Sequence, residues 1–472
     1  MQRSGSRKVA TAYVLVALGW VGVRVWAFAH AHEIEFPDSA TYLEKAASPL
    51  WTRDFFFGAG RFFVVPLIYK WAALPGSSRQ WLTATQLGIS LGAWLLLAWA
   101  VAAPIARRWL GVLSFAAVLT FGLTADVVQW DTIVLSESIT TSAFVLVIAA
   151  CLALAHRVSA GRVIALGAAF VAFGMSREAS SLLLLPIGVS LTCWAVWFLR
   201  ETRPRLWSFA LACLTIVLVV VSFSVSGRGV RWFFPLLNVV GQRILPAPDR
   251  LAFYEARGMP VNETLRGMAG EFASGRNSTF YRSFDLVEFR AWIGAHGRQT
   301  YALDLLAHPG RTLVEPLQDV TEFVCPEIRQ YRPAGFIAVL PPVGTSFCAP
   351  RRATTIVAAT CLAGIALFGM VFAWRRRLSP ADGLWLLLVA AMLASWQPFV
   401  WMTWHVIGGM EVGRHVFSGV LQCRLAGLLL MLFAARQLSS RLMLLVMERA
   451  NRIDGGRAPR RPITRRGGDD DE

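Results

Sequence analysis

Residues 137–156 read ESITTSAFVLVIAACLALAH, an acid followed by an uncharged and mostly apolar run. An α-helix needs roughly 20 such residues to cross the hydrocarbon core of a bilayer. Similar runs recur at about 9–29, 81–104, 110–125, 162–176, 180–199, 206–225, 353–374, 383–402 and 415–435. We therefore predict a polytopic α-helical membrane protein with about ten transmembrane helices.

The composition agrees with this prediction. Hydrophobic residues make up 56% of the 472 residues and charged residues only 16%, whereas a soluble domain has about 45–50% and about 25%. The net charge of +17 could indicate nucleic-acid binding, but the arginines cluster at the ends of apolar runs and form no basic stripe with interleaved aromatics. We expect them to contact membrane lipids instead, and no nucleic acid as a partner.

Positive charges alternate from loop to loop. The loops expected on the cytoplasmic side contain Arg3, Arg7 and Lys8, then Arg107 and Arg108, Arg157 and Arg162, Arg200 to Arg205, Arg375 to Arg377, and an arginine-rich tail. The short loop at 126–136 contains no Lys or Arg. The positive-inside rule therefore predicts a multi-pass protein of the plasma membrane with both termini in the cytoplasm.

Two longer segments, 30–80 and 226–352, are predicted to face outward. The short apolar run from Phe62 to Leu74 contains Pro66 and is predicted to be juxtamembrane, since counting it as a span would place the later basic loops outside. The predicted organisation is an N-terminal transmembrane module at 1–225 with 30–80 as its first outer loop, an extracytoplasmic α or α+β domain at 226–352, transmembrane helices at 353–435, and a disordered, basic and then acidic cytoplasmic tail at 436–472.

The seven cysteines fall into two groups. Five lie in predicted spans and are expected to be inert apolar side chains. Cys325 and Cys348 lie in the outer segment, where an oxidising compartment would permit a disulfide that contributes about 3 kcal/mol. Two free thiols are the alternative, and without a second cysteine pair no metal site is expected.

Asp38 follows the first predicted span, in the stretch EFPDSATYL at 35–43. Asp38 or Ser39 could cap a helix that Pro37 precedes. Alternatively, Tyr42 and the neighbouring phenylalanines could desolvate the Asp38 carboxylate, which would make it a better general base.

More acids gather where the fourth predicted span begins. Glu137 lies between two serines, and a carboxylate at this depth is costly unless it is paired or faces a wet cavity. Glu137 could simply favour the positive end of its helix dipole, or it could line a cavity. Asp126 and Asp131 could be plain loop acids or could contact a substrate.

Arginines are expected on the same outer side. Arg177 opens the sixth span, the stretch EVGRH occupies 411–415 before the last span, and Arg424 lies inside that span. An arginine near a helix centre costs about 2.5–3.5 kcal/mol, so Arg424 must find a partner or a water-filled cavity. These arginines could form ion pairs, or they could bind an anionic group such as phosphate, which suits a planar guanidinium.

Taken in order, these motifs resemble the GT-C superfamily of integral membrane glycosyltransferases, which includes the protein O-mannosyltransferases and the aminoarabinose transferase of lipid A. The resemblance is carried by Asp38 with Tyr42, Arg61 to Pro66, Ser136-Glu137-Ser138, Ser176-Arg177 and Glu411 to His415. It covers mainly residues 1–200, with a weaker echo at 403–425. Family members have a second acid after the first, where this chain has Ser39, so the use of a divalent cation stays open.

The resemblance implies an inverting transfer of a sugar from a polyprenyl-phosphate-linked donor to a glycan, lipid or protein acceptor on the extracytoplasmic face. Asp38 would be the general base, with Glu137 as a second catalytic residue. The implied substrate-binding residues are Tyr42, Arg61, Asp131, Arg177, Glu411, Arg414, His415 and Arg424. Two alternatives are a transporter or flippase for a lipid-linked substrate, and a ligase or polymerase of lipid-linked glycans that depends on arginines rather than on Asp38.

Overall fold

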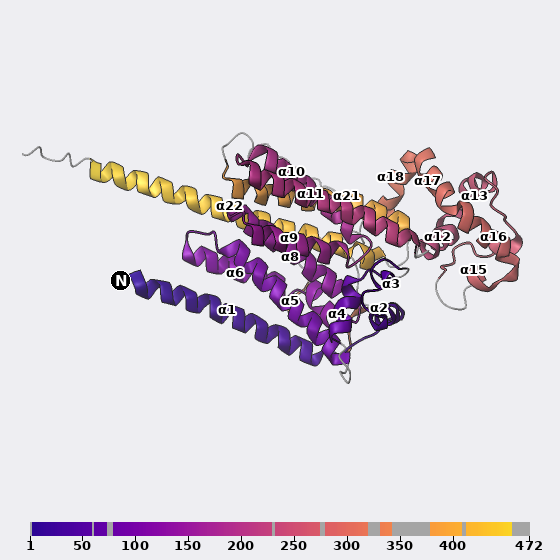
Figure 1. Cartoon of the computed structure of the whole chain (residues 1–472), viewed down its shortest axis with the longest axis horizontal. Helices are drawn as coiled ribbons and strands as arrows, with labels where there is room; N and C mark the ends of the chain where they lie inside the picture. The colour runs from indigo at the N-terminus through magenta and orange to yellow at the C-terminus, as the bar shows by residue number, and fades with distance from the viewer. Residues whose placement is uncertain are drawn as a thin grey trace, which may run out of the picture. The chain divides into compact units, whose positions relative to one another are not determined.

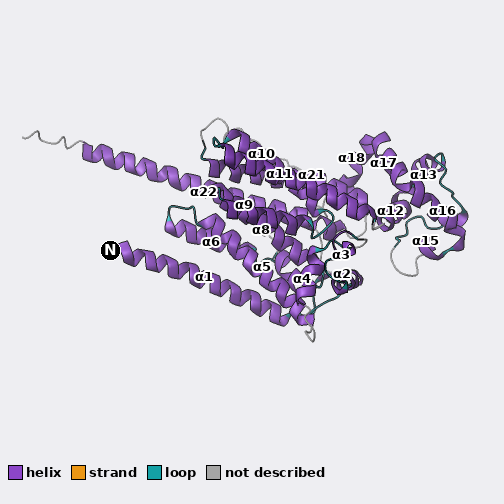
Figure 2. Cartoon of the chain, viewed as in Figure 1, coloured by secondary structure: helices purple, strands orange, loops and turns teal. Residues whose placement is uncertain are grey.

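The computed structural model describes residues 2–58, 61–72, 79–228, 232–273, 279–319, 331–341, 378–407 and 412–455. These residues form helices and no strand, with two isolated bridges, Ile34 with Ile133 and Thr124 with Leu340 (Figure 2). The chain divides into two compact units, Met1–Leu430 and Met431–Glu472.

Seven of the described helices are long and apolar enough to cross a membrane. They are α1 (Gln2–His30), α5 (Arg79–Ala102), α8 (Glu137–His156), α10 (Ser180–Trp197), α11 (Thr202–Arg228), α21 (Pro380–Ile407) and α22 (Val412–Gly455) (Figure 1). Two further apolar helices, α6 (Arg108–Phe121) and α9 (Ala160–Gly174), are shorter, at 14 and 15 residues. The chain is therefore a multi-pass helical membrane protein. Each predicted span coincides with one of these helices except 353–374, which lies outside the described residues.

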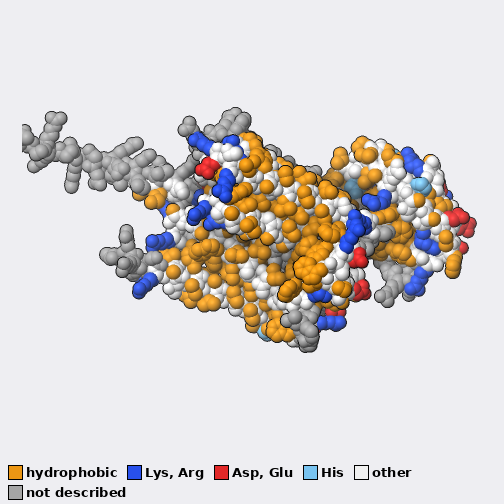
Figure 3. Space-filling view, viewed as in Figure 1, with side chains coloured by type: hydrophobic (Ala, Val, Ile, Leu, Met, Phe, Trp, Pro, Cys, Tyr) orange, Lys and Arg blue, Asp and Glu red, His pale blue; other side chains and the backbone are white. Residues whose placement is uncertain are grey.

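Helix α8 lies at the centre of the first unit. It packs against α5, α9 and α21, and 83% of its apolar window is buried, against 17% for α1. The neighbouring pair α10 and α11 is in close contact at Gly188, where a Cβ atom would overlap the Thr215 hydroxyl. Small residues allow such close approach, which drives helix association where no hydrophobic effect operates. Figure 3 shows hydrophobic side chains over the flanks of these helices.

Three short helices follow α1 at the end of the bundle that we call the site end. They are α2 (Pro37–Ala47), α3 (Arg53–Phe57) and α4 (Val64–Ala72). The expectation that Pro37 precedes the helix is wrong. Pro37 is its first residue, a position that suits the fixed φ and missing N–H of proline. Neither Asp38 nor Ser39 is the N-cap, because Phe36 holds that position and donates its backbone N–H to Ser39 Oγ at 2.9 Å.

The loop before α8 is buried rather than exposed. It contains α7 (Ala125–Val128) and the 3₁₀ turn η1 (Gln129–Thr132), and every residue from 124 to 136 is buried. Residues 331–341 lie against this loop, since Ala125 donates its N–H to Leu340 O at 2.9 Å. The same segment also contacts the chain just after α1, where His32 donates its N–H to Ala334 O at 2.9 Å. Gly335 makes this approach feasible with a φ of +73°, because a Cβ atom there would overlap the His30 carbonyl oxygen.

Residues 232–273 and 279–319 contain the helices of the predicted outer domain that the structure describes. Its elements are α12 (Phe233–Val239), η2 (Val240–Ile244), α13 (Pro248–Glu255), α14 (Glu263–Arg266), α15 (Thr279–Arg282), η3 (Phe284–Leu286), α16 (Val287–Trp292), η4 (Ile293–Gly297), α17 (Arg298–Ala307), α18 (Pro309–Val314) and η5 (Glu315–Asp319). They enclose their own core, in which Leu237, Val240, Leu265 and Phe280 are fully buried. Of the two predicted classes, α or α+β, the described residues show only helix.

The second unit contains the end of α22, which continues to Gly455. Disorder was predicted from residue 436 onward, so the described structure differs over 436–455. The reason is that residues 431–454 contain no Gly or Pro and keep apolar side chains such as Leu438, Leu442 and Val446. Residues 456–472 lie outside the described part of the chain.

Candidate functional site

Six ionisable side chains from five separate segments meet at the site end of the bundle. We call them the site cluster: Asp38 of α2, Arg61 before α4, Glu137 of α8, Arg177 between α9 and α10, and Arg414 and His415 of α22. All six were predicted as site residues from the sequence, and in the folded chain their side chains contact one another.

Arg414 connects the two acids of the cluster. Its Nε atom donates to Glu137 Oε1 at 2.8 Å, and its NH2 group lies 3.3 Å from Asp38 Oδ2. The other Asp38 oxygen, Oδ1, lies 2.6 Å from the NH2 group of Arg61. Asp38 and Glu137 are therefore joined through one guanidinium, although Asp38 and Arg414 are 376 positions apart in the sequence.

A second arginine supports Glu137 from the other side. The NH1 group of Arg177 lies 3.4 Å from Glu137 Oε1, and its NH2 group lies 3.0 Å from His415 Nδ1. Because a guanidinium can only donate, Nδ1 must accept, which makes His415 a neutral imidazole with its proton on Nε2. The Glu137 carboxylate is wholly buried, so the two arginines offset the cost of removing its charge from water.

The two acids of the cluster differ in solvent exposure. The Asp38 side chain is 44% exposed, whereas that of Glu137 is 0% exposed. The side chains of Arg414 and Arg61 are 8% and 9% exposed. Three guanidinium groups face two carboxylates, so the cluster carries one surplus positive charge. It thus combines an accessible carboxylate with a cationic lining that favours an anionic ligand.

Aromatic rings hold two of these arginines in place. The Arg61 guanidinium lies 4.4 Å from the centroid of the buried Tyr42 ring, and that of Arg414 lies 5.2 Å from the Tyr331 ring. Lys45 donates to the Arg61 carbonyl oxygen. Tyr331 and Lys45 were not predicted, because neither stands in a motif and both depend on chain segments that only folding brings together.

Asp131 and Arg424, two predicted substrate-binding residues, are instead held in buried ion pairs that include no member of the site cluster. Asp131 pairs with Arg24 of α1, and Arg424 pairs with Asp126 of α7. Burial raises the pKa of both Asp126 and Asp131, and the neighbouring arginines oppose this rise. Asp126 and Asp131 therefore lie in the predicted loop as members of buried ion pairs, and any substrate contact by Asp131 or Arg424 stays a prediction.

Arg24 was not predicted either, although it is an arginine inside a predicted span and therefore, like Arg424, needs a partner or a water-filled cavity. It is fully buried and donates to Gly122 O and Ser90 Oγ, each at 2.9 Å, as well as to Asp131. Ser138 donates to the other Asp131 oxygen at 3.0 Å. This network fixes the start of α8, where Glu137 lies.

Two hydroxyl groups fix the same loop from the side of α2 and α4. Ser39 Oγ donates to Val134 O at 2.6 Å. The Tyr69 hydroxyl lies 2.8 Å from both Leu135 O and Gln86 Oε1. Because these contacts anchor α2 and α4 to the residues just before Glu137, they set the separation between Asp38 and Glu137.

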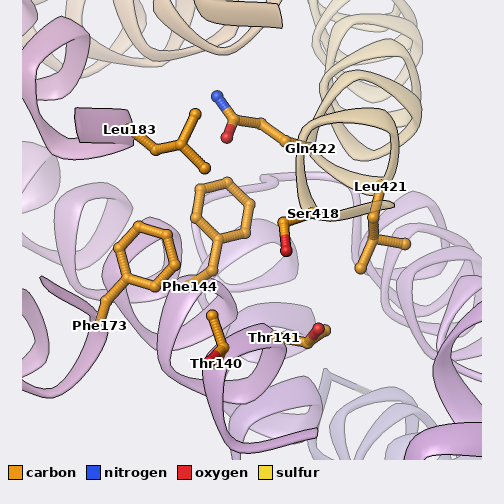
Figure 4. A pocket seen from close by; sticks show the side chains of 8 residues that line it. All are labelled: Thr140, Thr141, Phe144, Phe173, Leu183, Ser418, Leu421 and Gln422. Carbon is orange, nitrogen blue, oxygen red and sulfur yellow. The ribbon is translucent and has the colours of Figure 1, made fainter. Parts of the chain in front are cut away.

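A small recess lies one helical turn from the site cluster, between α8, α9, α10 and α22 (Figure 4). Its lining consists of Thr140, Thr141, Phe144, Phe173, Leu183, Ser418, Leu421 and Gln422. Thr140 Oγ1 and Gln422 Oε1 are buried and have no hydrogen-bond partner among the described residues. The recess therefore presents aromatic and aliphatic walls with a few polar atoms.

A divalent cation needs several oxygen, nitrogen or sulfur ligands close together. The described residues contain no group of three His, Cys, Asp or Glu side chains able to hold a metal ion. The Arg414 guanidinium contacts both Asp38 and Glu137, so each acid already has a cationic partner. Three other predicted residues, Glu411, Cys325 and Cys348, lie outside the described residues.

Comparison with known proteins gives no sequence match and a weak structural similarity. The chain matches no protein-family model and no curated protein sequence. Among solved structures it is similar to the archaeal oligosaccharyltransferase AglB from Archaeoglobus fulgidus, in complex with an inhibitory peptide and a dolichol-phosphate, with 14% identity and a TM-score of 0.43. The match covers 97% of this chain and 52% of AglB, so the chain spans about half the length of that protein. AglB is a GT-C membrane glycosyltransferase, the class that the sequence motifs resemble, but a likeness of this size carries no argument about function.

Proposed function

We propose that this chain is a membrane glycosyltransferase that moves a sugar from a polyprenyl-phosphate donor to an acceptor on the extracytoplasmic face. The observation that carries the proposal is the site cluster, in which an accessible Asp38 lies beside buried arginines with a surplus positive charge. Such a transfer needs both features at a membrane surface. It requires a base for the acceptor and cations for a phosphate leaving group.

The proposed chemistry is a single inverting displacement. The acceptor hydroxyl transfers its proton to the Asp38 carboxylate while its oxygen forms a bond to the anomeric carbon. The bond from that carbon to the phosphate oxygen breaks, and polyprenyl phosphate leaves with the electron pair. Arg177 and Arg414 stabilise the charge on the leaving phosphate, and Glu137, buried between them, keeps both guanidinium groups oriented.

We assign the lipid part of the donor to the side of the site cluster on which the small recess lies. Thr140 and Thr141 of its lining stand one helical turn from Glu137, and Phe144, Phe173 and Leu183 form its apolar walls, so the first part of an isoprenoid chain that leaves the phosphate would meet apolar side chains. Positioning by binding groups outside the reacting bond is a common source of rate enhancement.

The arginine pattern supports the sidedness of this site. Arg107, Arg157, Arg162 and Arg200 all lie at the ends of spans opposite to the site cluster. By the positive-inside rule that opposite end is cytoplasmic. We therefore propose that the site cluster lies on the extracytoplasmic face of the plasma membrane, that both termini lie in the cytoplasm, and that the chain has about ten spans in all.

Asp38→Asn tests the role of the base. Removal of a positioned general base typically lowers a rate about 10²–10⁴-fold. Glu44→Gln is a matched control, because Glu44 is an exposed acid on the same helix and is no member of the cluster. The first measurement is a glycan profile of envelopes from cells lacking the gene, complemented with each variant. The sugar that disappears then identifies the polyprenyl-phosphate donor for a transfer assay in proteoliposomes.

The expected result is transfer by wild type and Glu44→Gln, and none above background by Asp38→Asn at equal expression. Full transfer by Asp38→Asn would exclude Asp38 as the base. Alanine variants of Asp38 and Arg414 cannot separate a transferase from a ligase, because the two side chains contact each other. Arg414→Lys keeps the charge and should retain a reduced rate. If Arg414→Lys abolishes transfer while Asp38→Asn retains it, the result would favour the ligase. If the lipid-linked substrate crosses the membrane without covalent transfer, the result would favour a flippase.

A further inference from the structure

Helices α17 and α18 of the outer domain expose an uncharged, mostly apolar surface between residues 302 and 314. The exposed residues between 302 and 314 are all uncharged, and they are Ala302, Leu303, Leu306, Ala307, Pro309, Gly310, Leu313 and Val314. Leu306 is 77% exposed and Leu313 is 61% exposed. We call these residues the apolar face. Figure 3 shows hydrophobic side chains gathered over this part of the domain.

Asp304 and Arg311 of the same two helices are turned away from this face, whereas Arg298, at the start of α17, is exposed. Asp304 is buried and pairs with Arg311 and with His308 Nδ1, the latter at 2.8 Å. Arg311 also lies 3.1 Å from Asp249 of α13. A water-facing helix pair shows the opposite arrangement, with its charges outward and its leucines inward.

Hydrogen bonds hold α18 beside a membrane span. Trp401 Nε1 of α21 donates to Leu313 O at 2.9 Å, and His405 Nε2 lies 2.9 Å from Thr312 O. Tyr301 of α17 donates its hydroxyl to His405 O at 2.8 Å. The apolar face is therefore fixed to the last two turns of α21, at the site end.

The position along α21 gives an approximate depth. The candidate span ends at Val406, and Trp401 stands five residues earlier, which corresponds to roughly 8 Å at 1.5 Å per residue. Helices that lie in the membrane interface bury their apolar side about 5–10 Å deep. Val406 itself is 52% exposed, so the lipid-facing surface of α21 continues toward α18.

We propose that the apolar face of α17 and α18 inserts into the lipid leaflet at the site end of the bundle and anchors the outer domain to the bilayer surface. Leu306, Leu313 and Val314 contact acyl chains and the lower headgroup region. The paired Asp304, His308 and Arg311 remain on the protein side. The outer domain is then a membrane-resting part of the enzyme, and this inference does not depend on the proposed reaction.

Hydroxyl-radical oxidation of the wild-type full chain in phosphatidylcholine nanodiscs tests the proposal. Radicals made in water modify side chains that water reaches, and mass spectrometry locates the products. Phe284 is the internal control, because it lies in the same domain and is 91% exposed. After correction for intrinsic reactivity, we expect Leu306 and Leu313 to be oxidised about tenfold less than Phe284, as for side chains inside the interface.

A second measurement identifies what covers the apolar face. A nanodisc lipid with a diazirine near its glycerol end should cross-link to the peptide at 302–314 and not to the peptide at 279–292. Equal oxidation of Leu306 and Phe284 would overturn the proposal. Protection without lipid cross-linking would also overturn it, because another protein surface, such as a second copy of the chain, would then cover the face.

Discussion

The ion pair between Arg24 and Asp131 gives the sharpest test of how this bundle is stabilised. Both side chains are almost fully buried, at 0% and 3% exposure, and they join α1 to the loop before α8. Arg24→Met removes the guanidinium with little change in volume. Asp131 then keeps Ser138 as a neutral donor at 3.0 Å, which leaves a buried carboxylate without a cationic partner.

The expected cost follows from that uncompensated charge. Breaking a buried ion pair by removing one partner typically destabilises a protein by about 3–5 kcal/mol. Asp131→Asn alone leaves the guanidinium of Arg24 with Gly122 O and Ser90 Oγ, so it should also be destabilising. The double variant contains neither unpaired charge, and we expect an interaction energy of about 2–3 kcal/mol in the double-mutant cycle.

The measurement is the free energy of unfolding in mixed micelles titrated with dodecyl sulfate, followed by tryptophan fluorescence. The pair Arg79 and Glu35 is a matched control, because it has the same chemistry at 2.7 Å but side chains that are 61% and 30% exposed. An exposed pair contributes about 0–1 kcal/mol, so Arg79→Met should lower the free energy of unfolding by at most about 1 kcal/mol. Additive effects of Arg24→Met and Asp131→Asn would refute the reasoning, as would equal costs for the buried and the exposed pair.

Three further outcomes follow from the described contacts. Ser39→Ala should lower the free energy of unfolding by about 1–3 kcal/mol, because the hydroxyl links Phe36 N to Val134 O inside the protein; an unchanged transition would contradict this. His415→Asn should retain more transfer activity than His415→Phe, since only Asn can still accept from Arg177, and equal rates would exclude that role. The raised pKa of Asp126 means that the folded state binds this proton more tightly than the unfolded state. That stabilisation is complete below about pH 3.9 and is lost as pH rises through the folded pKa, so above about pH 4 the unfolding free energy should fall more steeply in wild type than in Asp126→Asn.

The span pattern could be predicted because each helix needs only its own apolar length. The run at 137–156 specifies α8 without reference to any other segment. The same reasoning required a partner for Arg424 but could not identify Asp126, because a carboxylate 298 positions away becomes a partner only through tertiary packing. Asp131 stands in the same short stretch as Glu137, yet Glu137 joins the site cluster and Asp131 pairs with Arg24.

The buried loop at 124–136 shows why local sequence was insufficient. Two acids in a short loop normally indicate exposure, but Arg24 and Arg424 enter from α1 and α22 and make burial feasible. Likewise, Tyr331 acquires its place beside Arg414 from a segment that no motif marks. Residues whose partners are distant in sequence are therefore the ones that sequence reasoning leaves open.

The late position of Arg414 has a consequence for biosynthesis. A ribosome delivers Asp38 and Glu137 to the membrane long before it reaches residue 414, so a nascent chain holds both acids before the guanidinium that joins them exists. Until then Glu137 has only the more distant Arg177, at 3.4 Å, as a counter-charge. The membrane-insertion machinery therefore handles an incomplete site cluster, and a product truncated before Val412 lacks the guanidinium that joins its two acids.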